Sequence, residues 1–276
     1  MMGLIKVDFK RVLKDKLFLV LCIVAGAFAL VTPLMNALLF GDMSKEMLGE
    51  LSLMGVSVTG RSLFFAAFSP ADNVGLVLPI LLGIILCKDF GQGTVRNKII
   101  GGKSRSAIFL STFVVCFTVM IGVLFAHALL SLLMNLIFFP FQTTPFTASD
   151  LGYILLSFLL ILLLYFFMAA FISFLCATMR SAGLVILLHV ATTMVMSIVG
   201  AILQVGDLIF TMSEDAAATS VIAFIRRINV FGYGSAIGQG MSYDSVDLLF
   251  YVFTPVLLGA GLLLLGMRSF GRKDLK

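Results

Sequence analysis

Six long apolar runs, each of roughly 20 residues, limit the folds that are open to this chain. They lie at about 17–39, 68–87, 108–138, 151–177, 184–204 and 248–267. With a rise of ~1.5 Å per residue, an α-helix of about 20 residues crosses a hydrocarbon core of ~30 Å. Strands of a membrane barrel would instead alternate apolar and polar residues over about 10 positions. The runs therefore predict an all-α, polytopic membrane protein with six transmembrane helices, forming one transmembrane domain over residues 1–276.

The composition also indicates lipid rather than water as the solvent. The chain is 61% hydrophobic and only 12% charged, whereas about a quarter of the residues in a soluble domain are charged. The cysteines all fall inside the apolar runs, where cysteine behaves as a small hydrophobe; they are Cys22, Cys87, Cys116 and Cys176. Neither a CxxC pair nor a Cys/His cluster occurs, so we expect no metal site and no disulfide framework.

Lysine and arginine are unevenly distributed between the two sets of connecting segments. Fifteen of the 19 fall in segments 1–16, 88–107, 178–183 and 268–276, and the other four lie in segments 40–70 and 205–247. Segments rich in Lys and Arg stay in the cytoplasm. The bias predicts a multi-pass plasma-membrane protein with both termini cytoplasmic. We expect the positive net charge to serve topology rather than nucleic-acid binding, and the two outer segments to contain short helices.

The first 16 residues have the pattern of a basic amphipathic helix. Leu4, Phe9 and Val12 recur at helical spacing, and most positions between them are charged. Such a helix lies in the membrane interface. The alternative is a disordered basic leader that only orients the first span. We interpret run 17–39 as a retained span, because it is too long for the apolar core of a signal peptide.

Residues suited to catalysis or ion coupling are scarce in the spans. Asp72, Asp89 and Asp150 stand at span ends, and no acidic residue lies near a span centre. This argues against an enzyme and against a proton- or sodium-driven carrier. The two histidines, His127 and His189, lie in different spans. Each is expected to form a hydrogen bond to a neighbouring helix, although a functional role is the alternative.

The sequence Gly101-Gly102-Lys103-Ser104 looks like the end of a phosphate-binding loop. The full motif requires a glycine five positions before Gly102, where Asn97 stands, and a strand before the loop. We therefore expect no cofactor in this chain, and any ATP and Mg²⁺ to be bound by another polypeptide.

The inner connection at 88–107 carries the most informative pattern. An apolar stripe is predicted on a short helix, with polar residues beside it and glycines at both ends; the stripe is Phe90, Val95, Ile99 and Ile100, and the polar residues are Arg96, Asn97 and Lys98. We interpret the segment as a helix lying across the cytoplasmic face. A solvated basic loop that only sets the topology is the alternative.

This connection resembles that of the permease subunits of type-2 ATP-binding-cassette (ABC) exporters. Shared features are an acidic residue after a span, then F-G-x-G-T-x-R-N-K, then S-R at the start of the next span; the matching residues are Asp89, Phe90, Gly93, Thr94, Arg96, Asn97, Lys98, Ser104 and Arg105. Many relatives have Glu where Asp89 stands. The amphipathic start and the six spans extend the resemblance over nearly the whole chain.

The resemblance implies a function and a set of partners. In that family the N-terminal helix is an elbow helix, and the segment after the second span is a coupling helix seated in a separate nucleotide-binding subunit. Two permeases, identical or different, and two ATPases form the transporter within the lipid bilayer. ATP-driven closure of the ATPases moves peptide-, lipid- or drug-like substrates outward. Permeases built in this way often export antimicrobial peptides or protect against them.

Two other classes of function remain open from the sequence. One is a secondary transporter or channel, which would need coupling carboxylates or a polar pore lining. The other is a membrane enzyme or an immunity factor that works without an ATPase partner.

Overall fold

The computed structural model describes residues 1–41, 58–71, 73–91, 94–142, 145–179, 181–212, 216–237 and 243–272. These residues form helices and the turns between them. Six of the helices are long and apolar enough to cross a membrane, in agreement with the predicted six spans. They are α2 (Lys16–Phe40), α5 (Asn73–Gly91), α7 (Arg105–Asn135), α8 (Ala148–Met179), α9 (Ala182–Met212) and α11 (Ser245–Arg272).

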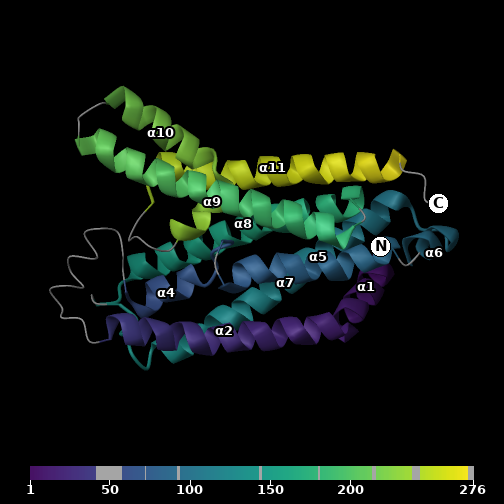
Figure 1. Ribbon diagram of the computed structural model, residues 1–276, viewed down its shortest axis with the longest axis horizontal. Helices are drawn as coiled ribbons and strands as arrows, with labels where there is room; N and C mark the ends of the chain where they lie inside the picture. Colours follow the sequence, from purple (N-terminus) through teal and green to yellow (C-terminus); the bar gives the residue numbers. More distant parts are fainter. Residues whose placement is uncertain are drawn as a thin grey trace.

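The six long helices run side by side along the long axis of the molecule (Figure 1). The short helices α1 (Met2–Lys14) and α6 (Thr94–Ile100) lie at one end, together with the last turns of α11. We call this the α1–α6 end. The short helices α4 (Gly60–Ala66) and α10 (Ala216–Ile228) lie at the opposite end, the α4–α10 end. Helix α8 packs against α5, α7, α9 and α11 and so forms the centre of the bundle.

The second span begins at Asn73 rather than at the predicted 68. Helix α4 ends at Ala66, and the chain turns through Ser69 and Pro70 before α5 starts. Proline disfavours helical backbone angles at the residue before it, which accounts for the break. Apolar residues stand on both sides of the turn, at 63–68 and from Val74 onward, and the prediction joined Phe68 to the span across the polar residues Ser69, Asp72 and Asn73.

The connections predicted to lie outside contain short helices, as expected. Besides α4 and α10, a 3₁₀ helix, η1, occupies Val230–Ser235. Helix α4 is held at its start by a capping box, in which the Thr59 hydroxyl accepts from the Ser62 amide at 3.2 Å and the Ser62 hydroxyl accepts from the Thr59 amide at 3.0 Å. Most of the remaining predicted outer segment 40–70 lies outside the described residues.

A single residue separates α1 from α2. Asp15 has an extended backbone (φ −70°, ψ 135°), and its Oδ1 accepts a hydrogen bond from the Leu17 amide at 2.9 Å. An aspartate in this position caps a helix start by satisfying an amide that has no partner inside the helix. The chain therefore makes a sharp bend at Asp15, and α1 lies across the end of the bundle (Figure 1).

Glycines allow α11 to pack closely against α7 and α8. A Cβ atom at Gly266 would lie 2.4 Å from Cζ of Phe109, and one at Gly259 would lie 2.6 Å from Cε1 of Phe166. Phe109 is fully buried, so its ring has no free space to move into. Small residues at helix crossings are how membrane helices reach close contact.

We expect Gly266→Leu to lower the free energy of unfolding by about 1–3 kcal/mol, because overpacking forces the neighbouring ring or helix to shift. The matched control is Gly261→Leu on the same helix, since a Cβ at Gly261 meets no atom within 4 Å. Thermal unfolding of the purified protein in detergent measures both. Equal melting temperatures for the two variants would contradict the packing.

Candidate functional site

Four charged side chains from three helices meet at the α1–α6 end. They are Asp8 and Arg11 of α1, Asp89 of α5 and Lys98 of α6. We call these four residues the charge cluster. Its carboxylates are almost completely buried, and the Lys98 side chain is 11% exposed.

Lys98 stands between the two carboxylates of the cluster. Its Nζ lies 2.6 Å from Oδ1 of Asp8 and 3.9 Å from Oδ2 of Asp89. Arg11 forms an ion pair with Oδ2 of Asp89 through Nη2. The hydroxyl of Ser111 on α7 donates to Oδ2 of Asp8 at 2.7 Å. Two positive and two negative charges balance, which is the condition under which buried charges are tolerated.

A second ion pair joins α5 to the bend between α1 and α2. Nζ of Lys88 donates to both carboxylate oxygens of Asp15, at 2.8 and 2.9 Å. Partial burial raises the pKa of Asp15, but the hydrogen bonds from Lys88 and from the Leu17 amide outweigh it, so the pKa lies below its ordinary value. The carboxylate is therefore ionised at neutral pH and joins α5 to the start of α2.

Helix α6 is anchored by apolar packing on its inner side. Val95 is buried against Leu4 of α1, Ile108 of α7 and Phe270 of α11, and Ile99 packs beside this group. Phe90 at the end of α5 meets Phe270 edge to face, with ring centroids 5.7 Å apart. The short helix is thus fixed to three other helices as well as to the charge cluster.

The end of α6 is a Schellman turn at the Gly101-Gly102 pair, where the sequence predicted a bend. Gly102 has φ +77°, in the left-handed region that favours glycine. Its amide donates to the Ile99 carbonyl at 2.9 Å, and the Lys103 amide donates to the Lys98 carbonyl at 3.1 Å. Ser104 then caps α7, since its hydroxyl accepts from the Ala107 amide at 3.3 Å. The segment that looked like a phosphate loop is thus a turn between two helices.

The predicted site residues divide into an inward set and an outward set. Asp89 and Lys98 belong to the charge cluster, and Phe90 packs on α11. Arg105 donates to the carbonyl of Gly271 at 3.0 Å, close to the end of α11. Thr94 is half-buried, Arg96 and Asn97 are exposed, and Gly93 lies outside the described residues.

The prediction that Ile100 belongs to the apolar stripe of segment 88–107 was wrong. This side chain is 74% exposed, on the opposite side of α6 from Val95. Residues 96 and 100 are four apart and so share one face of a helix, whereas 95, 98 and 99 share another. The face of α6 that points away from the bundle therefore comprises Arg96, Asn97 and Ile100, and we call it the outer face of α6. Lys103 in the following turn is exposed as well.

Asp8, Arg11 and Ser111 were missed as members of the site. The N-terminal pattern assigned Asp8 to the polar face of α1. Yet Asp8 lies four residues from both Leu4 and Val12, which are buried, and so shares their face. The position of the Asp8 carboxylate within an apolar face indicated that a cation from another helix would be buried beside it.

The histidines and cysteines lie inside the bundle. The His127 ring pairs through Nδ1 with the Ala25 carbonyl of α2 at 2.9 Å, which confirms the expected contact with a neighbouring helix. His189 is fully buried, with its ring 6.3 Å from that of Phe171. All four cysteines have free thiols. Within the described ranges, no group of three His, Cys, Asp or Glu residues is arranged to hold a metal ion.

A polar pocket of about 440 Å³ occupies the α4–α10 end, and no predicted site residue lines it. Asn229 donates from Nδ2 to the Met196 carbonyl at 2.8 Å, while its Oδ1 and the Ser197 hydroxyl are buried without a hydrogen-bond partner among the described residues. Arg227 pairs with Asp247 at 2.5 Å. This pocket offers hydrogen-bonding groups to a polar ligand or to water.

Comparison with known proteins relates the chain to a family. A family model described as "Protein of unknown function (DUF2705)" matches residues 71–276. The match covers α5, α6 and the four later spans, and it begins after α1 and α2. No curated protein and no solved structure matches the chain.

Proposed function

Because this chain belongs to the DUF2705 family, whose function is unknown, we propose a function from its geometry and its sequence pattern. We propose that it is the membrane-spanning permease subunit of an ATP-driven ABC exporter. In this proposal a separate nucleotide-binding subunit hydrolyses ATP, a second permease completes the transporter, and a peptide-, lipid- or drug-like substrate leaves the cell. Export of antimicrobial peptides, or protection against them, is one role that the resemblance to this exporter family implies.

The observation that carries this proposal is the two-sided character of α6. Its inner side is fixed to the bundle through Val95 and Lys98, whereas its outer face presents Arg96, Asn97 and Ile100. Arginine is enriched at protein interfaces, and the exposed isoleucine beside it adds apolar surface that a partner would bury. A partner bound there would push on a helix that has tight connections to several spans.

Displacement of α6 would reach the spans by three routes. The charge cluster joins Lys98 to α1 and α5. The Schellman turn at Gly102 leads within a few residues into α7. Arg105, at the start of α7, holds the end of α11 through backbone carbonyls. In this mechanism α6 is the coupling helix, and α1 is the elbow helix that moves with it.

The distribution of charge supports a cytoplasmic position for the α1–α6 end. This end carries the segments that are rich in Lys and Arg, whereas Arg61, Arg226 and Arg227 lie in the short helices of the opposite end. The positive-inside rule thus supports a position of α6 on the side where ATP is available.

A secondary transporter, a channel or an immunity factor without an ATPase partner is the alternative. Such a protein has no need of an exposed apolar side chain on α6. Its activity would persist after purification as a single kind of chain.

Co-purification tests the proposal. When an affinity-tagged chain is produced together with a candidate nucleotide-binding ATPase from the same genome, we expect both polypeptides in one complex whose ATP hydrolysis depends on the permease. The control is the same ATPase produced with an unrelated six-span protein. Recovery of a fully active permease with no ATPase bound would contradict the proposal.

A further inference from the structure

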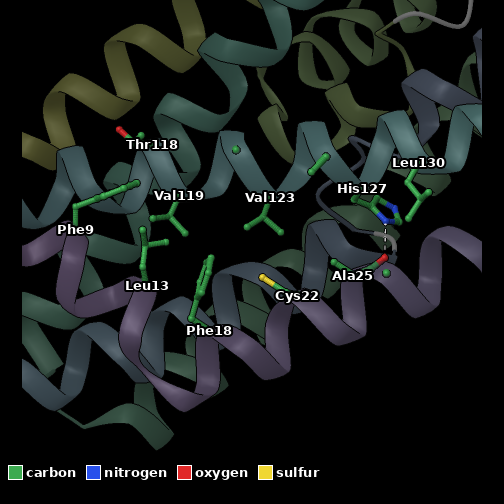
Figure 2. Close-up of a pocket in the computed structure, with 13 residues that line it drawn as sticks. Phe9, Leu13, Phe18, Cys22, Ala25, Thr118, Val119, Val123, His127 and Leu130 are labelled. Carbon is green, nitrogen blue, oxygen red and sulfur yellow. Dashed lines mark hydrogen bonds between the residues drawn. The ribbon is translucent and has the colours of Figure 1, made fainter.

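An apolar groove of about 370 Å³ lies between α1, α2 and α7. Figure 2 shows Phe9, Leu13 and Phe18 with Thr118 towards one end, and Ala25, His127 and Leu130 towards the other. The groove therefore extends from the interfacial helix α1 along the surface of α7. Thr118 and Leu130 are 12 positions apart on α7, and at ~1.5 Å per residue this corresponds to about 18 Å.

Small residues create the groove. A Cβ atom added at Gly26 of α2 or at Gly122 of α7 would meet no atom within 4 Å, so both glycines face open space. The polar groups in the lining already have partners. The Thr118 hydroxyl donates to the Val114 carbonyl at 2.8 Å, and Nδ1 of His127 pairs with the Ala25 carbonyl. The groove thus offers an apolar surface to its occupant.

The dimensions favour a single acyl chain over a helix. A helix about 10 Å across would fill on the order of 1,400 Å³ over 18 Å, which exceeds all the empty space between the lining atoms, about 800 Å³. Neighbouring helix surfaces are also apolar: Leu19 and Ile23 of α2 are each 63% exposed. Lipid chains are therefore the surroundings from which the groove would be filled.

A row of lysines flanks the mouth of the groove on α1. Lys6, Lys10 and Lys14 are exposed and follow one another at intervals of four residues, next to Phe9 and Leu13. The acidic residues nearby do not neutralise the row, because Asp8 is paired with Lys98 and Asp15 with Lys88. Basic residues at the cytoplasmic interface attract anionic lipid headgroups.

We propose that this groove binds one acyl chain of an anionic phospholipid, whose headgroup rests on Lys6, Lys10 and Lys14. The site is independent of the proposed function. Its occupant packs against α1, which also carries Asp8 and Arg11 of the charge cluster. A bound anionic lipid therefore holds α1 in the position where it pairs with α5 and α6.

Native mass spectrometry of the full chain tests the proposal, after reconstitution into nanodiscs of phosphatidylglycerol or phosphatidylcholine and mild delipidation. We expect one retained phosphatidylglycerol and a higher melting temperature in that lipid. Replacing Lys10 by Gln should weaken retention about fivefold, and the triple Lys6/Lys10/Lys14→Gln variant should abolish it. The control is Lys103→Gln, an exposed lysine away from the groove.

Variants that fill the groove with larger side chains distinguish an acyl-chain site from a general attraction of anionic lipids to a basic surface. Gly26→Leu/Gly122→Leu should remove the retained phosphatidylglycerol although every lysine remains, whereas Gly261→Leu, also in open space, should keep it. Equal retention of the two lipids would overturn the proposal. So would unchanged retention in the filled variant, or a copurifying polypeptide that cross-links to position 122 in place of lipid.

Discussion

Replacing Asp89 by Ala is expected to lower the free energy of unfolding by about 2–4 kcal/mol, less than for a wholly buried pair because the Arg11 side chain is 34% exposed. Removing one partner from a buried ion pair leaves the remaining charge desolvated and uncompensated. Here both Arg11 and Lys98 would lose a carboxylate, and only Asp8 would remain for two cations. The effect should appear as a large drop in melting temperature and as weakened attachment of α1 and α6 to the bundle.

The matched control for Asp89→Ala is Asp244→Ala at the other end of the molecule. Asp244 also pairs with an arginine, Arg227 at 3.7 Å, but its side chain is 60% exposed. Exposed ion pairs contribute about 0–1 kcal/mol to the free energy of unfolding, so this variant should have nearly the same melting temperature as the original protein. Asp89→Asn keeps the shape of the side chain and isolates the loss of charge.

A compensating change provides a stricter test of the cluster. In Arg11→Met/Asp89→Leu one cation and one carboxylate leave together, while Lys98 keeps its contact with Asp8 at 2.6 Å. Replacing a buried ion pair by apolar side chains is often neutral or stabilising. The double variant should therefore recover most of the stability lost in Asp89→Ala. A double variant as unstable as the single one would show that the cluster is not what holds α1 to α5.

The second large effect is expected on the outer face of α6. Arg96→Glu/Ile100→Glu should weaken the complex with the ATPase by about 30-fold or more, since the loss of a single hot-spot residue at the centre of an interface costs about 2 kcal/mol or more. Both side chains are exposed, so the isolated permease should keep its melting temperature. The measurement is ATP hydrolysis by the reconstituted complex, as a function of ATPase concentration.

A similar surface change elsewhere controls for the added charge. Ile137, beyond the opposite end of α7, is 67% exposed. Ile137→Glu should leave the ATPase affinity unchanged. Loss of affinity in both variants would mean that acidic residues act through insertion or aggregation rather than through an interface on α6.

These two predictions assign different roles to neighbouring residues of one segment. The sequence placed Asp89 and Arg96 together as contacts for the ATPase. The structure turns Asp89 inward, against Arg11 and Lys98, and leaves Arg96 exposed. A variant at Asp89 therefore tests the internal connection, and a variant at Arg96 tests the proposed interface.

Much of the fold could be predicted because lipid imposes simple rules. Runs of apolar residues predicted the six spans, and the helical spacing of Leu4 and Val12 predicted α1. The glycine pair predicted the end of α6, because a left-handed turn at position 102 requires such a residue.

The pairing of the charged residues could not be predicted in the same way. Asp8 and Lys98 are far apart in the sequence, and only the packing of both α1 and α6 against α7 brings them within 2.6 Å. Helix α6 has only seven residues, too few for hydrophobic periodicity to decide whether Ile100 faces inward. Its orientation is set by Val95, which fills a space formed by three other helices.

Photo-crosslinking from position 100 tests most directly whether α6 couples this chain to an ATPase. A benzoylphenylalanine introduced in place of Ile100 lies on the exposed face of α6, and one in place of Ile137 lies at the other end of the molecule. In membranes that contain the co-produced ATPase, we predict a covalent adduct with the ATPase from position 100 and none from position 137. Equal adducts from both positions, or none from position 100, would contradict the account.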